Sequence, residues 1–386
     1  MARGIIVLGS TGSIGQQALD VIRANPAELR VAGLAAGQNL DLLARQVQEH
    51  APAYVSAPSL APGSTWNGAR ALSLIELCQV PDAERVLVST VGATGLLPTL
   101  AAIRAEKTVL LANKEVLVMA GELVIAEARR VGIPILPVDS EHNAVWQCFA
   151  GDCLLGAGTT DGPLRRIVLT ASGGAFRDLS PDQLTRVTPT QALAHPNWVM
   201  GPKVTVDCAT LMNKAFEVVE AHWLFGLRYD QIDVVLHRES VVHALVEFVD
   251  GSFKAELSLP DMRIPIQHAL TYPERRPSTW PRLRIEALGQ LTFAPLDHGR
   301  YPCFDLALAA ASAGGTVATA LSAADDVAVD RFLDGRIAFT EIPELIDRAV
   351  QAHQPIAHPT VDDVLSVDEQ VRRDLERRLG QSRRRA

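Results

Sequence analysis

Cysteine is scarce in this chain of 386 residues, which contains five, at positions 78, 148, 153, 208 and 303. They form no CxxC pair, and their number is odd. Zinc knuckles and disulfide-stapled folds need paired or closely spaced cysteines, so neither is expected. The cysteine content is instead typical of a protein from a reducing compartment.

Long hydrophobic runs and an excess of positive charge are also missing. The N-terminus has four consecutive apolar residues, Ile5 to Leu8, which is too short for a signal-peptide core. No stretch approaches the roughly 20 apolar residues of a membrane helix. The net charge is −8, with a pI of about 5.7, so nothing global attracts nucleic acid. The sequence therefore predicts a cytoplasmic protein without a membrane or nucleic-acid partner.

Lysine is rare as well, because only five of the 36 basic residues are lysines, at positions 107, 114, 203, 214 and 254. In a chain that prefers arginine, a lysine suggests a position that needs a compact, flexible ammonium group. Hydrophobic residues make up 48% and charged residues 21% of the chain, as in globular domains. At roughly 150 residues per domain, the length predicts two or three domains.

Short apolar runs alternate with amphipathic segments in the first third of the chain. Strands are expected at residues 5–8, 30–37, 85–90, 108–113 and 133–140. Helices are expected at residues 16–25, 41–50, 96–107 and 117–132. This alternation is typical of α/β folds and predicts a doubly wound (Rossmann-like) parallel sheet over residues 1–137.

From residue 138 onward the pattern changes. Strand-like runs are expected at residues 165–171, 232–237 and 241–259. A strongly periodic helix is expected at 209–226, and Asp250-Gly251 between two alternating runs predicts a hairpin. These features favour an α+β catalytic domain over residues 138–272.

The remainder of the chain shows no strand pattern of note. Residues 273–300 are rich in proline and are interpreted as a linker. The Ala-, Leu-, Asp- and Arg-rich segment that follows predicts a small C-terminal α-helical domain over residues 301–386. Its basic tail is interpreted as a solvated helix end that frays.

A glycine-rich turn follows the first expected strand. Gly9, Gly12 and Gly15 form a G-x-x-G-x-x-G pattern, where dinucleotide-binding folds place a pyrophosphate on helix N-terminal amides. A tight packing turn is the alternative. Three neighbouring hydroxyl residues add donors, namely Ser10, Thr11 and Ser13. The second strand ends without the acidic residue that holds the ribose of NAD, which mildly favours NADP.

Two groups of charged residues suggest a metal site. Asp139 and Glu141 end an expected strand, whose alternation would put both carboxylates on one face, as Mg²⁺ or Mn²⁺ needs. Asn213, Lys214 and Glu217 share one face of the expected helix at spacings of three and four residues. A solvated strand end and an exposed ion pair are the alternatives. Glu220, one turn beyond Glu217, could be mistaken for it.

Three further motifs carry polar residues at strand ends or in loops. Ser172 precedes two glycines after a strand and could hold a phosphate, although an ordinary turn is the alternative. The loop with His195, Trp198 and Met200 is either a lid or a partly buried loop. Lys114, between Asn113 and Glu115, would face the crevice at the strand ends. Together, the motifs describe one site with a dinucleotide turn, metal carboxylates and phosphate donors.

The motifs GSTGSIG, LANKE, VDSEHNA, TASGGAF, HPNWVMGPKVTVDCAT and MNKAFEVVEAHWLFG resemble, in this order, the 1-deoxy-D-xylulose-5-phosphate reductoisomerase family. The resemblance spans residues 5 to about 270. It implies rearrangement and NADPH-dependent reduction of the phosphorylated ketose 1-deoxy-D-xylulose 5-phosphate to 2-C-methyl-D-erythritol 4-phosphate, in non-mevalonate isoprenoid biosynthesis. It further implies Mg²⁺, Mn²⁺ or Co²⁺ and a homodimer.

The resemblance also implies roles for individual residues. The implied metal ligands are Asp139, Glu141 and Glu217. The implied phosphate-holding residues are Ser172, Cys208, Asn213 and Lys214. The implied neighbours of the reacting carbons are Lys114 and Ser140. The implied lid residues, around 194–203, are His195, Trp198 and Met200. The implied cofactor contacts are Thr11, Gly12, Ser13, Ile14, Gly37, Gln38, Asn39, Asn113, Glu115 and Gly201.

Two residues depart from the pattern of that family. Cys208 stands where serine is common, and a thiol is a weaker donor than a hydroxyl. Gln38 stands where lysine is common, which would weaken pairing with the 2′-phosphate of NADPH. Two alternatives share the glycine-rich domain: another NAD(P)-dependent dehydrogenase of the semialdehyde or homoserine type, and a nucleotide sensor without enzymatic activity.

Overall fold

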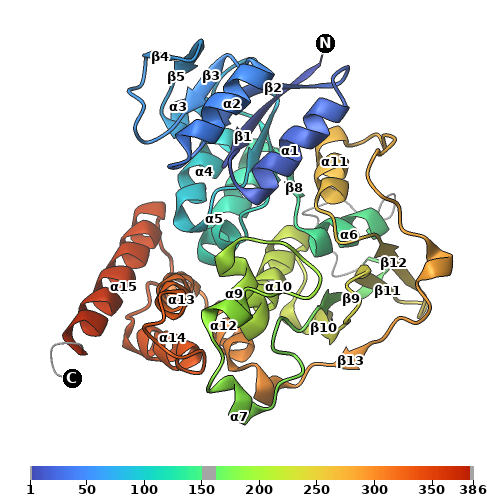
Figure 1. Ribbon diagram of the computed structural model, residues 1–386, viewed down its shortest axis with the longest axis vertical. Coiled ribbons are helices and arrows are strands. Elements are labelled where there is room, and N and C mark those ends of the chain that lie inside the picture. Colours follow the sequence, from blue (N-terminus) through green and yellow to red (C-terminus); the bar gives the residue numbers. More distant parts are fainter. Residues whose placement is uncertain (1, 150–161, 383–386) are drawn as a thin grey trace.

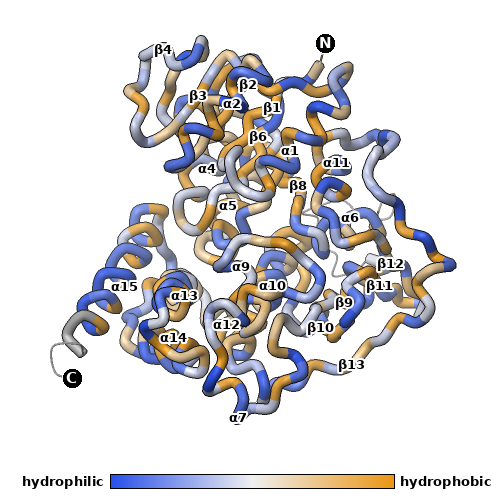
Figure 2. The backbone as a smooth tube through the Cα atoms, viewed as in Figure 1, coloured by the Kyte–Doolittle hydropathy of each residue, from blue (hydrophilic) through white to orange (hydrophobic). Residues whose placement is uncertain are grey.

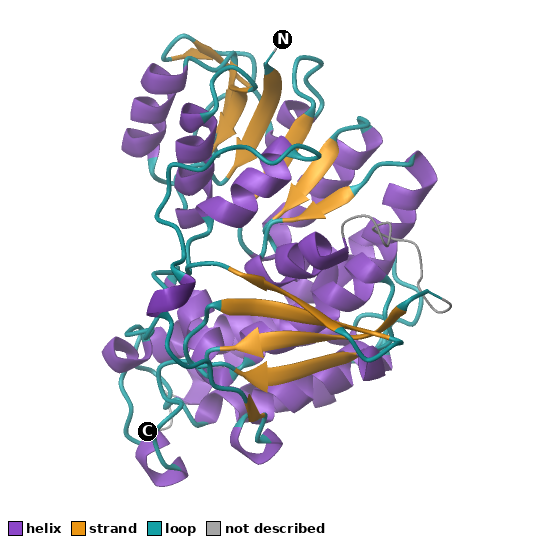
Figure 3. Ribbon diagram, turned by 90° about the vertical axis from the view of Figure 1, so that its right-hand side faces the viewer, coloured by secondary structure: helices purple, strands orange, loops and turns teal. Residues whose placement is uncertain are grey.

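The computed structural model describes residues 2–149 and 162–382, and the strands within these ranges form two sheets (Figures 1 and 3). Eight strands form the first sheet, in the order β4-β5-β3-β2-β1-β6-β7-β8. Its neighbouring strands are parallel, except that β4 and β5 are antiparallel. Cys153 and residues 383–386 of the basic tail lie outside the described residues.

The first sheet confirms the expected doubly wound architecture. Its strands are β1 Arg3–Leu8, β2 Leu29–Ala35, β3 Tyr54–Ser56, β4 Thr65–Trp66, β5 Ala69–Ala71, β6 Arg85–Val88, β7 Thr108–Leu111 and β8 Ile135–Pro137. Its helices are α1 Ser13–Ala24, α2 Leu40–His50, α3 Leu74–Cys78, α4 Leu96–Arg104 and α5 Glu115–Val131, with a 3-10 turn η1 at Gly92–Gly95. Helices flank both faces (Figure 3), which is why β1, β6 and β7 are continuous apolar runs.

The second sheet has the order β12-β11-β9-β10-β13 among the described residues. Its strands are β9 Leu164–Ala171, β10 Ile232–Leu236, β11 Val242–Phe248, β12 Phe253–Leu257 and β13 Ala294–Pro295. The accompanying helices are α6 Ser140–Phe149, α7 Pro181–Leu184, α8 Pro189–Ala192, α9 Pro202–Thr210, α10 Met212–Phe225 and α11 Arg263–Thr271, with a 3-10 turn η2 at Tyr229–Gln231. The expected hairpin at Asp250-Gly251 is confirmed, because β11 and β12 pair antiparallel across it.

Two expected elements need correction. Ser140 and Glu141 do not continue a strand: β8 ends at Pro137, and α6 begins at Ser140, with Glu141 in its first turn. The helix expected from residue 209 begins at Met212, because Leu211 adopts a left-handed conformation (φ 58°) that separates α10 from α9. In both places a new helix begins, at Ser140 and at Met212, and hydrophobic periodicity does not reveal where one element ends and the next begins.

The C-terminal segment is helical, as expected. Its helices are α12 Pro302–Ala313, α13 Val317–Leu333, α14 Glu341–Ala352 and α15 Val361–Ser382. Buried α13 lies at the centre and packs against the other three helices and against α5 and α9. The outer helix α15 is largely hydrophilic (Figure 2).

The proline-rich segment 273–300 is mostly irregular. It contains 3-10 turns η3 Ile285–Ala287 and η4 His298–Arg300, and β13, which extends the second sheet beside β10. Across the helices that the structure describes, none has both the length and the apolar character needed to cross a membrane.

Candidate active site

A cavity of about 550 Å³ lies between the two sheets and collects most of the expected site residues. Its walls come from α1, from the segments after β7 and β8, from β9, from the loop before α9, and from α9 and α10. The expected residues that line it are Ser13, Ile14, Lys114, Asp139, Ser140, Glu141, Ser172, His195, Trp198, Met200, Gly201, Cys208, Asn213, Lys214 and Glu217.

Three carboxylates converge at one end of this cavity. Asp139 follows β8, Glu141 lies in the first turn of α6, and Glu217 lies on α10. One ligand atom from each lies within 4.8 Å of those of the other two. Hard carboxylate oxygens at this separation are a donor set suited to Mg²⁺ or Mn²⁺. The ion pair that Lys214 forms with Glu217 on α10 is buried and not exposed.

Two lysines are interleaved with the three carboxylates. The Lys114 ammonium lies 2.7 Å from Asp139 Oδ2 and 2.6 Å from Asn213 Oδ1. The Lys214 ammonium lies 2.6 Å from Glu141 Oε1 and also pairs with Glu217 on its own helix. Burial opposes ionisation of both lysines, but the neighbouring carboxylates outweigh it and raise both lysine pKa values. Both side chains therefore remain ammonium donors.

The carboxylates respond to the same surroundings in opposite directions. Burial favours the neutral form of Asp139, but the adjacent Lys114 charge outweighs it and lowers the Asp139 pKa. The pKa of Glu217 is raised, first by burial and then by the Glu141 charge. A site that holds carboxylates close together in this way favours a cation between them.

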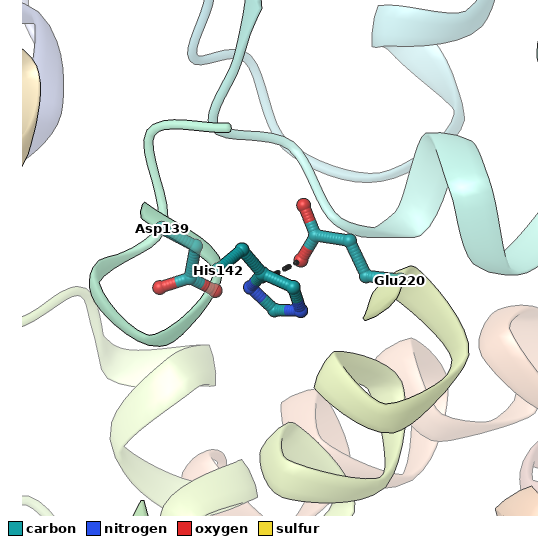
Figure 4. A group of neighbouring side chains, drawn as sticks. All are labelled: Asp139, His142 and Glu220. Carbon is teal, nitrogen blue, oxygen red and sulfur yellow. Dashed lines mark ion pairs between the residues drawn. The ribbon is translucent and has the colours of Figure 1, made fainter. Parts of the chain in front are cut away.

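Asp139 also belongs to a second group, together with His142 and Glu220 (Figure 4). His142 and Glu220 are fully buried, and His142 Nδ1 lies 3.5 Å from Glu220 Oε2. His142 Nε2 lies 2.7 Å from the Glu217 carbonyl oxygen and therefore donates to it. Burial raises the pKa of Glu220 to about 7. Among the described residues, Glu217 lines the cavity and Glu220 does not, which agrees with the choice of Glu217 over Glu220 from the sequence.

Ser172 and His195 form a hydrogen-bonded pair in the cavity lining. His195 Nδ1 accepts hydrogen bonds from the backbone amides of Asn197 (3.2 Å) and Trp198 (2.9 Å). Its Nε2 therefore carries the proton and donates to Ser172 Oγ at 2.9 Å. Burial, followed by the Arg177 charge, lowers the pKa of His195 to about 4. Because Ser172 Oγ also accepts from the Gly174 amide, its own proton is left to point elsewhere.

The Ser-Gly-Gly turn after β9 packs directly on α9. Gly174 has φ +71°, and a Cβ there would lie 2.4 Å from the Cys208 carbonyl oxygen. The turn therefore places Ser172 close to the Cys208 end of α9. Burial raises the pKa of Cys208 far above its ordinary value, so the side chain stays a neutral thiol.

Residues 194–201 form an irregular loop, and the expected lid range of 194–203 runs into α9, which begins at Pro202. The Trp198 ring contacts the buried His243 ring edge to face, at a centroid distance of 5.9 Å. Asn197 donates to the Arg238 carbonyl oxygen at 2.8 Å and lies 2.7 Å from Ser240 Oγ. The loop thus lines the cavity and is tied to the second sheet.

The glycine-rich turn has the expected shape. Gly9 has φ +81°, and a Cβ there would lie 2.5 Å from the Ser89 carbonyl oxygen, so only glycine fits. Helix α1 begins after Gly12, and no side chain among the described residues caps its first amides. Uncapped amides at a helix N-terminus are suited to an anion. Ser10 points inward instead, because its hydroxyl donates to Gln46 at 2.8 Å.

Seven of the expected cofactor contacts lie outside the cavity lining: Thr11, Gly12, Gly37, Gln38, Asn39, Asn113 and Glu115. Asn39 caps α2 by accepting from the Leu42 amide at 3.1 Å. The buried Asn113 donates to the Gly92 carbonyl oxygen at 3.0 Å and accepts from the Val116 amide. Gln38 is exposed on the loop after β2.

The sequence interpretation missed several lining residues, among them His243 on β11 and Asp261 and Arg263 near α11. His243 interrupts an apolar strand, which was a usable signal. Asp261 and Arg263 form a close ion pair (2.6 Å), and the Arg263 guanidinium lies over the Trp280 ring. Both residues lie in a stretch rich in proline and arginine, residues 260–282, where no pattern distinguished them.

A dinucleotide-type α/β fold joined to a cavity with three carboxylates and two lysines is the arrangement expected of a metal-assisted oxidoreductase. Three protein-family models match the chain, one after the other along the sequence. They are 1-deoxy-D-xylulose 5-phosphate reductoisomerase at residues 5–121, the 1-deoxy-D-xylulose 5-phosphate reductoisomerase C-terminal domain at residues 135–225, and the DXP reductoisomerase C-terminal domain at residues 257–374. The chain belongs to the 1-deoxy-D-xylulose 5-phosphate reductoisomerase family.

Individual relatives agree over nearly the full length. The reductoisomerase of Shouchella clausii is 48% identical over 383 residues, which cover 96% of this chain and 99% of the relative. That of Geobacillus kaustophilus is 47% identical over 379 residues, which cover 95% and 97%.

Solved structures of reductoisomerases from this family also superpose closely on the chain. A crystal structure of DOX-P reductoisomerase with NADPH, fosmidomycin and magnesium has a TM-score of 0.92 at 37% identity, covering 99% of both chains. The Zymomonas mobilis enzyme with NADPH has a TM-score of 0.88 at 35% identity, covering 98% of this chain and 99% of that one. The semialdehyde or homoserine type of dehydrogenase is therefore not favoured.

Proposed function

We propose that this chain converts 1-deoxy-D-xylulose 5-phosphate to 2-C-methyl-D-erythritol 4-phosphate, using NADPH and a divalent metal, in non-mevalonate isoprenoid biosynthesis. The observation that carries the proposal is the convergence of Asp139, Glu141 and Glu217 with two lysines in one cavity beside the glycine-rich turn. Neither a plain dehydrogenase nor a nucleotide sensor needs this cluster.

Asp139, Glu141 and Glu217 are the residues that would hold Mg²⁺ or Mn²⁺, with Co²⁺ as a further candidate. Their oxygens are close enough to share one ion, and magnesium is present in a relative of similar structure. A bound cation would polarise the ketone and stabilise negative charge that develops on oxygen. The Ser140 hydroxyl donates to Glu141 and so orients one of the ligands.

Lys114 holds a substrate oxygen near the reacting carbons. Its ammonium group, held beside Asp139 and Glu217, is placed to donate a hydrogen bond to that oxygen or to aid proton transfer. Asn213 and Glu217 fix the ammonium from α10, at 2.6 Å and 3.3 Å. Preorganised positive charge of this kind stabilises an oxygen that becomes negative during rearrangement.

Ser172, Cys208, Asn213 and Lys214 bind the substrate phosphate. The Ser172 hydroxyl accepts from His195 and Gly174, so its proton is available for a phosphate oxygen. Lys214 contributes positive charge from α10. Because the phosphate is remote from the reacting carbons, its binding energy can position them and close the loop over them.

The first domain, residues 1–137, binds NADPH, which supplies the hydride that reduces the rearranged aldehyde. Thr11, Gly12, Ser13 and Ile14 surround the uncapped start of α1, where a pyrophosphate fits. Further cofactor contacts are assigned to Gly37, Gln38, Asn39, Asn113, Glu115 and Gly201. Since Gln38 brings no positive charge, the preference for NADPH over NADH depends on other contacts.

The rest of the chain completes the enzyme. Residues 138–272 form the catalytic domain, with His195, Trp198 and Met200 in the lid; 273–300 form the linker and 301–386 the helical domain. The chain acts in the cytoplasm as a homodimer. Edge strand β12 exposes Phe253, with Val249 exposed beside it, which supports an interface there. Sedimentation of the purified chain tests the assembly: a monomer would rule it out.

The experiment that tests the function combines the protein, 1-deoxy-D-xylulose 5-phosphate, NADPH and Mn²⁺, and identifies the product by NMR. The expected product is 2-C-methyl-D-erythritol 4-phosphate, formed with stoichiometric NADPH oxidation. EDTA should stop the reaction and Mn²⁺ restore it. Turnover that EDTA does not affect, or NADPH oxidation only with a semialdehyde, would favour the plain dehydrogenase. If no substrate causes NADPH oxidation, the nucleotide sensor would be favoured.

A further inference from the structure

A second lysine-centred cluster lies immediately after the irregular loop of residues 194–201, the proposed lid loop, and outside the cavity lining. Lys203 is the second residue of α9, and its side chain is 20% exposed. Its ammonium lies 2.6 Å from Asp207 Oδ2, 2.8 Å from Asp325 Oδ2 and 3.3 Å from Asp326 Oδ1. Glu115 Oε1 lies 3.7 Å away.

The cluster joins parts of the chain that are far apart in sequence. Lys203 and Asp207 belong to α9, Asp325 and Asp326 to the central C-terminal helix α13, and Glu115 begins α5 directly after Lys114. Asp326 also pairs with Arg372 on α15. One ammonium thus connects the end of the lid loop to the C-terminal helices and to the helix that follows a cavity lysine.

The two ends of the loop are therefore held by different partners. At its start, His195 contacts Ser172, and Asn197 donates to the Arg238 carbonyl oxygen, so this end is tied to the second sheet. At its end, Lys203 is tied to α13. Between these two attachments lie Trp198 and Met200, whose side chains line the cavity.

The cluster holds more carboxylates than ammonium groups, and its carboxylates lie on different helices. Asp207 and Asp325 are buried, and within the described residues one carboxylate oxygen of each has no hydrogen-bond partner. Four carboxylates face a single cluster ammonium, with Arg372 reaching only Asp326. Burial and then the Asp325 charge raise the pKa of Asp207, so without Lys203 this buried pair would take up a proton, and α9 would lose the ion pairs that tie it to α13.

We propose that Lys203 and Asp325 are positioning residues, through which the C-terminal helices hold the hinge of the lid loop so that Trp198 and Met200 reach the cavity. Neither residue touches the substrate in this proposal. The kinetic part rests on the proposed function, whereas the position of α9 can be measured without any substrate.

The first test measures hydrogen–deuterium exchange of the full chain without substrate. Lys203→Met keeps the length of the side chain and removes its charge, so amides 204–210 of α9 should exchange roughly tenfold faster or more. Lys203→Arg should keep most of the protection. Arg331→Met is the matched control, because Arg331 on the same α13 pairs with Glu376 of α15 and not with α9.

The second test separates positioning from general damage by steady-state kinetics. Lys203→Met should raise KM for 1-deoxy-D-xylulose 5-phosphate about fivefold or more, and Arg331→Met should leave this KM unchanged. Should Lys203→Met not fold, Asp325→Asn takes its place, with faster α9 exchange again expected.

Wild-type protection of α9 in a folded charge variant would overturn the proposal, and so would equal loosening by Arg331→Met. A wild-type protein that fails to turn over the substrate would instead contradict the proposed function and leave the exchange result to stand by itself.

Discussion

At the scale of single residues, ion pairs between lysines and carboxylates organise the cavity. Burying a carboxylate without a partner is costly, and this cavity places several within a few ångströms of one another. Lys114 and Lys214 offset part of that cost, and a divalent cation would offset the remainder. Three of the five lysines, at 114, 203 and 214, lie in such clusters, so their scarcity in the sequence was an informative signal.

The His195 side chain gives a residue-scale prediction about pH. Its imidazole has a pKa of about 4 in the folded protein against an ordinary value of 6.5. Between these values the unfolded chain binds a proton that the folded protein does not, so this contribution to stability is complete above pH 6.5 and is lost as the pH falls toward 4.

The free energy of unfolding of the His195→Gln variant should therefore fall less steeply between pH 7 and pH 5 than that of the wild type. Urea unfolding of both proteins at the two pH values measures the difference. The same loss in both would mean that His195 is not held neutral by burial and by the two backbone amides.

At the scale of helices and strands, periodicity predicted the long elements and failed at the short ones. Strand β1, helix α1 and the β11–β12 hairpin follow from apolar runs and turn residues. Strands β4 and β5 have only two and three residues, which is too short for a period to show. The left-handed Leu211 was also missed, because leucine rarely adopts that conformation and only tertiary packing imposes it.

The candidate site was predictable to a similar degree. Asp139 and Glu141 were expected together for the wrong reason, since they meet at the start of a helix and not along a strand. The convergence of Glu217 with them depends on how α10 packs, and no local pattern contains that information. The resemblance to a known family supplied it.

The lid loop gives an element-scale prediction. Trp198→Ala removes the ring that packs against His243, so closure over the substrate should weaken and KM should rise about tenfold or more, in line with the loss of a buried aromatic anchor. The dissociation constant for NADPH should hardly change. Steady-state kinetics and NADPH titration measure the two effects.

Trp66→Ala, on β4 and outside the cavity lining, is the control for loss of a tryptophan. Unchanged KM and kcat in the Trp198 variant would show that residues 194–201 are a static loop.

At the scale of the whole molecule, the site is built where two parts of the chain meet, and a third part packs against the helices that carry it. The first sheet brings the glycine-rich turn, Lys114 and Asp139, and the second sheet with α10 brings Ser172, Lys214 and Glu217. The C-terminal helices contribute no lining residue among those described, yet α13 packs on both α5 and α9. Their position is that of a support for the helices that carry the site.

The most direct measurement of the central claim is calorimetric titration of Mn²⁺ into the wild type, Asp139→Asn and Glu217→Gln, with surface Asp230→Asn as the control. The account predicts one tight Mn²⁺ site in the wild type and in the control. Removing a residue that only supports a metal ligand typically lowers metal affinity roughly 10- to 100-fold, so both ligand variants should lose at least that much affinity for Mn²⁺. NADPH binding should persist in all four. Wild-type Mn²⁺ affinity in both ligand variants would contradict the shared cation site.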